Sequence, residues 1–154
     1  MRREEVGKKV KVRDASKLRV GIVVAQFNED ITGAMLDGAQ ATLERWGVKK
    51  KNISVAHVYG SFEIPFACGR LAAKKKLDAL VAIGCIVKGQ TRHDEYLANA
   101  VTNGLMRISL DLSIPVGLAV LTTNTLAQAK ERSRGEHNHG SQAATAALVA
   151  ALSV

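Results

Sequence analysis

The stretch that most constrains the fold is a nearly unbroken apolar run from Ala79 to Val87. It lacks the alternation of a half-buried strand, so both of its faces should be buried, as in the centre of a parallel sheet. The run breaks at residues 88–90, and apolar residues follow at helical spacing from Asp94 onward. Thr91 and Asp94 stand three positions apart, which is the spacing of a capping box. The stretch therefore predicts a strand, a tight glycine loop and a helix.

The same unit of strand, loop and helix recurs along the chain. Further strands are predicted at residues 18–25, 53–58 and 116–121, with helices at about residues 31–46, 65–73, 94–112, 125–132 and 141–152. This alternation predicts an α/β fold with three αβα layers, a flavodoxin-like, four-stranded parallel sheet in the order 2-1-3-4. We expect a single domain at residues 18–154. The basic segment before it, residues 1–17, is either a tail or an edge strand that pairs with a neighbouring chain.

The net charge of +8 comes largely from three basic stretches. Residues 1–17 hold seven lysines and arginines against three acids, and lysine triplets occupy residues 49–51 and 74–76. A basic surface attracts phosphate esters and nucleic acids without a specific site for either. No aromatic residue is interleaved with the lysines, which favours a solvated surface over a nucleic-acid face.

Cysteine usage and hydropathy indicate a cellular compartment. Cys68 and Cys85 both lie in apolar contexts, so the sequence predicts no disulfide framework and fits a reducing cytoplasm. The N-terminus lacks an apolar signal region, and the apolar stretches are too short to cross a membrane. We therefore expect a cytoplasmic protein without a membrane partner.

Several polar and aromatic residues follow the predicted strands, where open α/β sheets bind ligands. Phe27 follows the first strand, Ser61 and Glu63 follow the second, and His93 stands at the helix start after the third. Phe27 is either a loop aromatic that folds back on the core or a platform for a flat ring. Glu63 is either an acid favoured by a helix start or a hydrogen-bond partner for a polyol. The helix start near His93 favours an anion, and a histidine there is a candidate proton carrier.

Other candidate sites carry weaker signals. The sequence contains no glycine-rich nucleotide motif. His137 and His139 could bind a metal but lack acidic or cysteine companions, so no metal site is predicted. Cys85 could act as a nucleophile with His93, although a cysteine in an apolar strand is more often a buried, inert thiol. Arg132 and Arg134 are either surface charges or clamps for a phosphate.

Four separated motifs resemble the 6,7-dimethyl-8-ribityllumazine synthase family of riboflavin biosynthesis. They are residues 20–28 (VGIVVAQFN), 60–65 (GSFEIP), 84–96 (GCIVKGQTRHDEY) and 121–126 (LTTNTL), and the resemblance runs from about residue 18 to the C-terminus. It implies condensation of 5-amino-6-(D-ribitylamino)uracil with 3,4-dihydroxy-2-butanone 4-phosphate, with loss of phosphate and water. The resemblance implies neither a cofactor nor a metal. It also implies a homopentamer, in some members assembled into a 60-subunit shell.

The resemblance also implies roles for individual residues. Phe27 would stack on the pyrimidine, His93 would move protons, and Leu118 would complete a neighbouring subunit's pocket. The remaining roles are contacts to the pyrimidine and its ribityl chain (Ser61, Phe62, Glu63 and the backbone of Cys85, Ile86 and Val87) and to phosphate (Gln90, Thr91, Arg132).

The chain departs from the family pattern at three places. Tyr59 stands where proline is usual, Leu118 where phenylalanine is common, and residues 134–140 lack the usual lysine. Two functions other than catalysis are also compatible with the sequence. One is a shell or scaffold protein that has lost turnover, and the other is a monomeric flavodoxin-like flavin or nucleotide binder.

Overall fold

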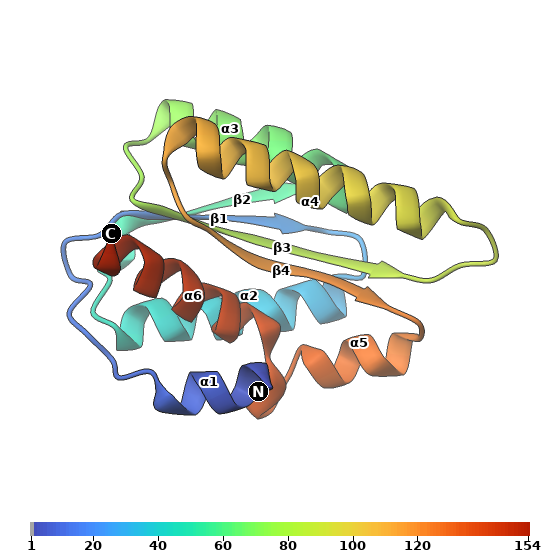
Figure 1. Cartoon of the computed structure of the whole chain (residues 1–154), viewed down its shortest axis with the longest axis horizontal. Helices are drawn as coiled ribbons and strands as arrows, with labels where there is room; N and C mark the ends of the chain where they lie inside the picture. The colour runs from blue at the N-terminus through green and yellow to red at the C-terminus, as the bar shows by residue number, and fades with distance from the viewer. Residues whose placement is uncertain (1) are drawn as a thin grey trace.

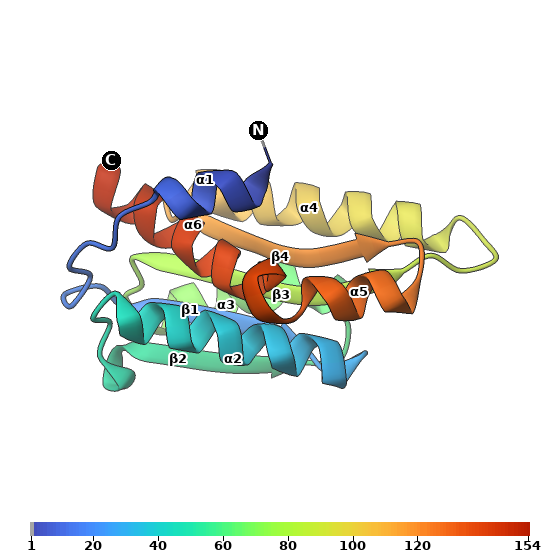
Figure 2. The same cartoon turned by 90° about the horizontal axis from the view of Figure 1, so that it is seen from below.

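The structure, a computed structural model, describes residues 2–154, leaving aside the side chains of residues 3 and 4. It has three layers, with a central sheet covered by helices on both faces (Figures 1 and 2). The sheet contains β1 (Val20–Ala25), β2 (Ile53–Val58), β3 (Ala79–Val87) and β4 (Val116–Thr123). All its pairings are parallel and the order is β2-β1-β3-β4. The predicted fold class and strand order are therefore confirmed.

Within residues 2–154, five helices cover the sheet, and a sixth lies outside these layers. Helices α3 (Ile64–Lys74) and α4 (His93–Leu112) pack on one face, and α2 (Glu29–Arg45), α5 (Leu126–Arg132) and α6 (His139–Ser153) pack on the other. Short 3₁₀ turns lie at Lys50–Asn52, Ser61–Glu63 and Gly135–His137. The strand arrowheads in Figure 1 all point to the end of the sheet at which α2 and α4 begin. That end is where the loops after the strands converge.

Strand β3 lies between β1 and β4 and is buried on both faces, as its unbroken apolar run predicts. Val81 and Ile83 belong to the apolar core under α2 and α6. Leu80 and Ala82 belong to the separate core under α3 and α4. Successive side chains of a strand point to opposite faces, so one apolar segment supplies both cores.

Two glycines allow α6 to pack closely against the rest of the domain. A side chain at Gly117 on β4 would collide with the backbone carbonyl of Ala143 on α6. A side chain at Gly140 at the start of α6 would collide with the carbonyl of Met35 on α2. The missing Cβ atoms therefore determine how closely α6 approaches both β4 and α2.

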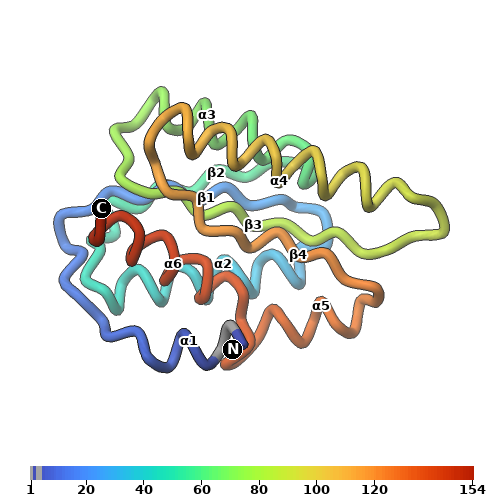
Figure 3. The backbone as a smooth tube through the Cα atoms, in the orientation of Figure 1, coloured from blue at the N-terminus to red at the C-terminus, as the bar shows by residue number. Residues whose placement is uncertain are grey.

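The N-terminal segment differs from the extended strand considered for it. Residues Arg3–Lys9 form helix α1, which packs on α6, and residues 10–19 then lead to β1 without regular structure (Figure 3). Arg13 attaches this connection to the end of α6, because its guanidinium donates to Ser153 Oγ at 3.0 Å. Pairing of this segment with a neighbouring chain stays a prediction.

Candidate active site

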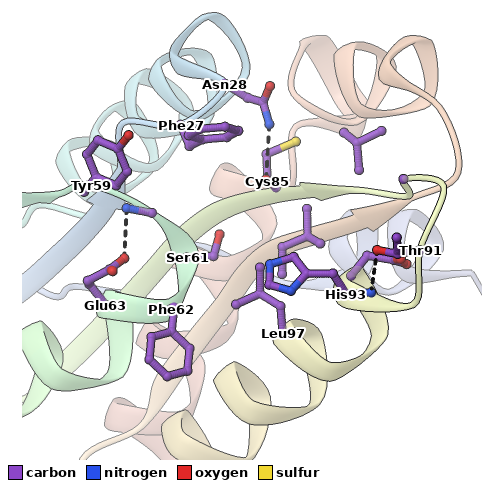
Figure 4. A pocket seen from close by; sticks show the side chains of 15 residues that line it. Phe27, Asn28, Tyr59, Ser61, Phe62, Glu63, Cys85, Thr91, His93 and Leu97 are labelled. Atoms are coloured by element: carbon purple, nitrogen blue, oxygen red, sulfur yellow. Dashed lines mark hydrogen bonds between the residues drawn. The ribbon is translucent and has the colours of Figure 1, made fainter.

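A pocket of about 740 Å³ opens at the carboxyl end of the sheet (Figure 4). It lies where the loops after β1, β2 and β3 meet the start of α4. Nine residues proposed from the sequence line it, namely Phe27, Ser61, Phe62, Glu63, Cys85, Ile86, Val87, Thr91 and His93. These residues come from three separate strand-to-helix connections, and parallel strands bring such connections to one edge of a sheet.

Phe27 forms part of the pocket wall rather than of the core. Its side chain is 62% exposed, which excludes the interpretation that it folds back on the core. Its backbone N–H donates to the carbonyl of Tyr59 at 3.1 Å, so the loops after β1 and β2 are joined here. The next residue, Asn28, adopts a left-handed backbone conformation (φ 60°), and its side-chain amide donates to the carbonyl of Cys85 at 3.3 Å. Asparagine tolerates this conformation better than most residues.

The 3₁₀ turn Ser61–Glu63 forms a second wall. Ser61 is buried under the turn, whereas the side chains of Phe62 and Glu63 are exposed. The backbone N–H of Gly60 donates to Glu63 Oε2 at 3.0 Å, so one carboxylate oxygen of Glu63 closes its own turn. The other oxygen has acceptor capacity for a ligand hydroxyl, and the exposed carboxylate faces the same pocket as Phe27.

The end of β3 forms the floor of the pocket with Cys85, Ile86 and Val87. Cys85 is buried, and burial, with a smaller contribution from the charge of Asp30, raises its pKa to about 11. Its thiol is therefore protonated near neutral pH and is a poor nucleophile. This argues against the alternative in which Cys85 attacks a substrate with help from His93.

The loop before α4 supplies Thr91 and the first residue of the helix is His93; both residues are exposed and line the pocket. The predicted capping box between Thr91 and Asp94 is wrong. Arg92 occupies the N-cap position without a side-chain cap, and Thr91 Oγ1 instead accepts from the backbone N–H of His93 at 3.3 Å. Because the helix starts one residue earlier than predicted, its first-turn N–H groups and His93 lie together, an arrangement that favours an anion.

Three residues proposed from the sequence do not line this pocket in the single chain. Gln90 is exposed in the loop between two lining residues. Leu118 lies on β4 opposite Ala82 and is 37% exposed. Arg132 ends α5, and its guanidinium donates to the carbonyl of Gln128 at 3.2 Å. The last two residues belong to β4 and to α5, which contribute nothing to the lining.

Six lining residues had not been proposed as site residues, namely Asn28, Tyr59, Gly60, Gly89, Asp94 and Leu97. The sequence signal that could have identified them was their position, either in the loops after β1, β2 and β3 or on the first turns of α4. A polar, aromatic or glycine residue in such a loop is as often structural as functional, so the pattern alone did not separate them.

Comparison with known proteins decides the family. A family model described as 6,7-dimethyl-8-ribityllumazine synthase matches residues 17–153. The chain belongs to this family. The lumazine synthase of Parabacteroides distasonis is 45% identical over 138 residues, which are 89% of this chain and 86% of that protein. The lumazine synthase of Porphyromonas gingivalis is 46% identical over 132 residues, 85% of this chain and 82% of that protein.

A third lumazine synthase, from Phocaeicola vulgatus, is 41% identical over 138 residues, 89% of this chain and 82% of that protein. The identification as an enzyme of this family, first suggested by the four sequence motifs, is thereby confirmed. Within residues 2–154 as described, no three His, Cys, Asp or Glu side chains gather in a way that could hold a metal ion. Nor does any helix in that part combine the length and the apolar character needed to cross a bilayer.

Proposed function

We propose that the chain catalyses the lumazine synthase reaction in this pocket. The amine of 5-amino-6-(D-ribitylamino)uracil condenses with the ketone of 3,4-dihydroxy-2-butanone 4-phosphate, phosphate leaves, and the ring closes with loss of water. The observation that carries the proposal is that one pocket contains an exposed aromatic ring, a hydrogen-bonding turn and a helix start with a histidine. These groups suit a flat ring, a polyol and a phosphate respectively.

The proposed roles follow the same arrangement. Phe27 stacks on the pyrimidine, and Ser61, Phe62 and Glu63 hold the ribityl chain and the ring edge. The backbone of residues 85–87 binds the pyrimidine. Gln90, Thr91 and Arg132 bind phosphate beside the helix start, and His93 transfers protons.

Most of the rate should come from holding the two substrates together. Positioning of two reactants can supply about 7–11 kcal/mol of the barrier, since it replaces a bimolecular encounter by an intramolecular step. A single proton carrier contributes on the order of 10²–10⁴-fold. The first-turn N–H groups of α4 stabilise the departing phosphate without a proton transfer of their own.

We also propose that the site is completed between subunits of a homopentamer, either free or within a 60-subunit shell. Leu118 lies on β4, outside the pocket of its own chain, and would reach a neighbour's pocket. Large apolar side chains on α4 support an interface, because Met106 is 60% and Leu110 is 70% exposed in the single chain. Both cysteines are free thiols, which suits a reducing compartment such as the cytoplasm.

The test is to mix both substrates with purified protein and to follow the absorbance of the lumazine product while native mass spectrometry reports the assembly. We expect turnover well above the uncatalysed rate from an assembly of five or sixty subunits. Product at the background rate from an intact assembly would instead indicate a scaffold. A monomer that carries a bound yellow cofactor would indicate a flavin binder.

A further inference from the structure

Tyr59 lines the pocket, although the resemblance assigns it no role. It follows β2 directly, and its side chain is 75% exposed. Such exposure means that the ring contributes little to the core of the single chain. A large aromatic ring left in water at the mouth of a pocket is a common feature of ligand sites.

The ring of Tyr59 pairs with the ring of Phe27. Their centroids are 6.4 Å apart and the ring planes are inclined by 59°. This distance lies within the range of tilted aromatic pairs, which are attractive beyond their buried area. Figure 4 shows the two rings side by side, with His93 and Thr91 across the pocket from them.

The backbone keeps both rings in place. The N–H of Gln26 donates to the carbonyl of Val58 at 2.8 Å, and that of Phe27 donates to the carbonyl of Tyr59 at 3.1 Å. On the other side of Tyr59, the N–H of Gly60 is bound by Glu63 Oε2 at 3.0 Å. The inclined pair is therefore attached to the end of the sheet rather than to a free loop.

We propose that Tyr59 is a further binding residue for the ribitylaminouracil, whose flat ring packs into the aromatic corner formed by Tyr59 and Phe27. This proposal rests on the proposed function and adds a residue that distinguishes this chain from relatives with proline at the position. The corner lies opposite the helix start at which phosphate is expected. Tyr59 should therefore affect the pyrimidine and leave the phosphorylated ketone unaffected.

The contact is made by the ring and not by the hydroxyl. In the part of the chain that the structure describes, the Tyr59 ring packs on Phe27, and no hydrogen bond to its hydroxyl is present. Tyr59→Phe should therefore bind the pyrimidine nearly as the wild type does, whereas Tyr59→Ala removes one of the two rings of the aromatic corner. Because the two rings touch, the effects of Phe27→Ala and Tyr59→Ala should not add independently.

The experiment measures KM for each substrate with the other at saturation, in the wild type, Tyr59→Ala, Tyr59→Phe, Phe27→Ala and the double variant. We expect Tyr59→Ala to raise KM for the pyrimidine on the order of 10-fold, as for the loss of one aromatic contact. KM for the butanone phosphate should stay within about 2-fold, since no ring contact to it is lost. The double variant should lose less than the product of the two single effects.

The other tyrosine of the chain supplies the control. Tyr96 is 64% exposed, does not line the pocket and packs near Arg92, so Tyr96→Ala should leave both KM values unchanged. Circular dichroism and native mass spectrometry show whether each variant keeps its fold and assembly. An unchanged pyrimidine KM in Tyr59→Ala, an equal rise in both KM values, or an equal loss in Tyr59→Phe would each overturn the proposal.

A failure of the proposed function remains distinguishable. If the wild type makes no lumazine, the function is wrong, and calorimetric titration of 5-amino-6-(D-ribitylamino)uracil into wild type and Tyr59→Ala then decides the role of Tyr59. Weaker binding by Tyr59→Ala supports the aromatic corner. Equal binding, or no binding by either protein, rejects it.

Discussion

A Cβ atom on Gly84 would lie 2.6 Å from the hydroxyl oxygen of Ser61. It would also lie 2.9 Å from Cδ1 of Ile64, the first residue of α3. The 3₁₀ turn that forms one wall of the pocket therefore rests directly on the backbone of β3. The missing side chain at residue 84 determines how deeply Ser61 sits in the site.

Gly84→Ala should displace this turn. We expect a loss of about 1–3 kcal/mol in the free energy of unfolding, the usual cost of overpacking a well-packed site. KM for the pyrimidine should rise about 5-fold, as for the loss of one hydrogen bond to the substrate. Urea denaturation and steady-state kinetics measure the two effects.

Gly33→Ala is the matched control for Gly84→Ala. Residue 33 lies within α2, and apart from the adjacent backbone of the helix itself no described heavy atom lies within 4 Å of the Cβ position. Alanine should therefore stabilise the helix by about 0.5–1 kcal/mol without a change in activity. An unchanged unfolding midpoint and pyrimidine KM in Gly84→Ala would show that the Ser61–Glu63 turn can move to accommodate the methyl group without affecting stability or substrate binding.

His93→Ala should slow turnover substantially without abolishing it. The histidine is the proposed proton carrier, worth on the order of 10²–10⁴-fold, while positioning of the two substrates persists in the variant. Lumazine absorbance measures the rate. His57→Ala is the control, since His57 is exposed on β2 and lies outside the pocket lining. A correctly folded His93→Ala with no turnover above background would contradict this division of the rate.

Asn138→Ala should destabilise the connection between α5 and α6. The buried Asn138 amide donates to the carbonyls of Ser133 at 2.8 Å and Ala34 at 3.0 Å, and its oxygen accepts from Ser141 N–H at 3.1 Å. Loss of these bonds leaves buried polar groups unpaired, so we expect the free energy of unfolding to fall by about 2–3 kcal/mol. Urea denaturation measures this change.

The control for Asn138 is an asparagine on the surface. Asn124 is exposed in the turn between β4 and α5, and its replacement by alanine should change the free energy of unfolding by less than about 0.5 kcal/mol. Equal urea midpoints for the two alanine variants would show that the Asn138 hydrogen bonds make no net contribution to the stability of the fold.

The two cysteine thiols should be unreactive in the folded protein. Burial raises the pKa of Cys68 from 9.0 to about 12, and burial followed by the charge of Asp30 raises that of Cys85 to about 11. At pH 8 we expect slow labelling by a disulfide reagent such as DTNB in native protein and fast labelling in guanidinium. Fast native labelling of Cys85 would show that the floor of the pocket opens.

The same pKa shifts predict how stability depends on pH. Between pH 9 and about 11 the unfolded state loses thiol protons that the native state keeps, so the unfolded state binds fewer protons. The free energy of unfolding should therefore fall as the pH rises through this window. Replacing both cysteines by alanine should make the free energy of unfolding less dependent on pH in this window. An unchanged slope would show that the two thiols do not cause the pH dependence.

The local sequence was sufficient to predict strands where the pattern of apolar residues is clear. The predicted bounds of β2 and β3 agree with the structure. For β3 the physical reason is that an unbroken apolar run needs cover on both faces. The meeting of Phe27 with the loop at residues 89–93 was also predictable. It follows from strand order, since parallel strands place their carboxyl ends at one edge.

Three features were not predicted, one of them local and two that depend on partners distant in the sequence. The capping box at Thr91 was the expected local interaction, but the hydroxyl bonds the N–H of His93 instead. The helix Arg3–Lys9 forms where its residues pack on α6, more than 130 positions later in the chain. The pairing of Tyr59 with Phe27 likewise joins two loops whose ring angle no local pattern specifies.

The sequence by itself determined the family, the order of the strands and the edge of the sheet at which the site lies, because these follow from apolar periodicity and from motifs read along the chain. Only the tertiary structure decided which side chains line the pocket. It placed Tyr59 beside Phe27, seated Ser61 over Gly84, and left Arg132 and Leu118 outside. Those outcomes depend on contacts between segments far apart in sequence, where a few tenths of an ångström decide whether a side chain fits.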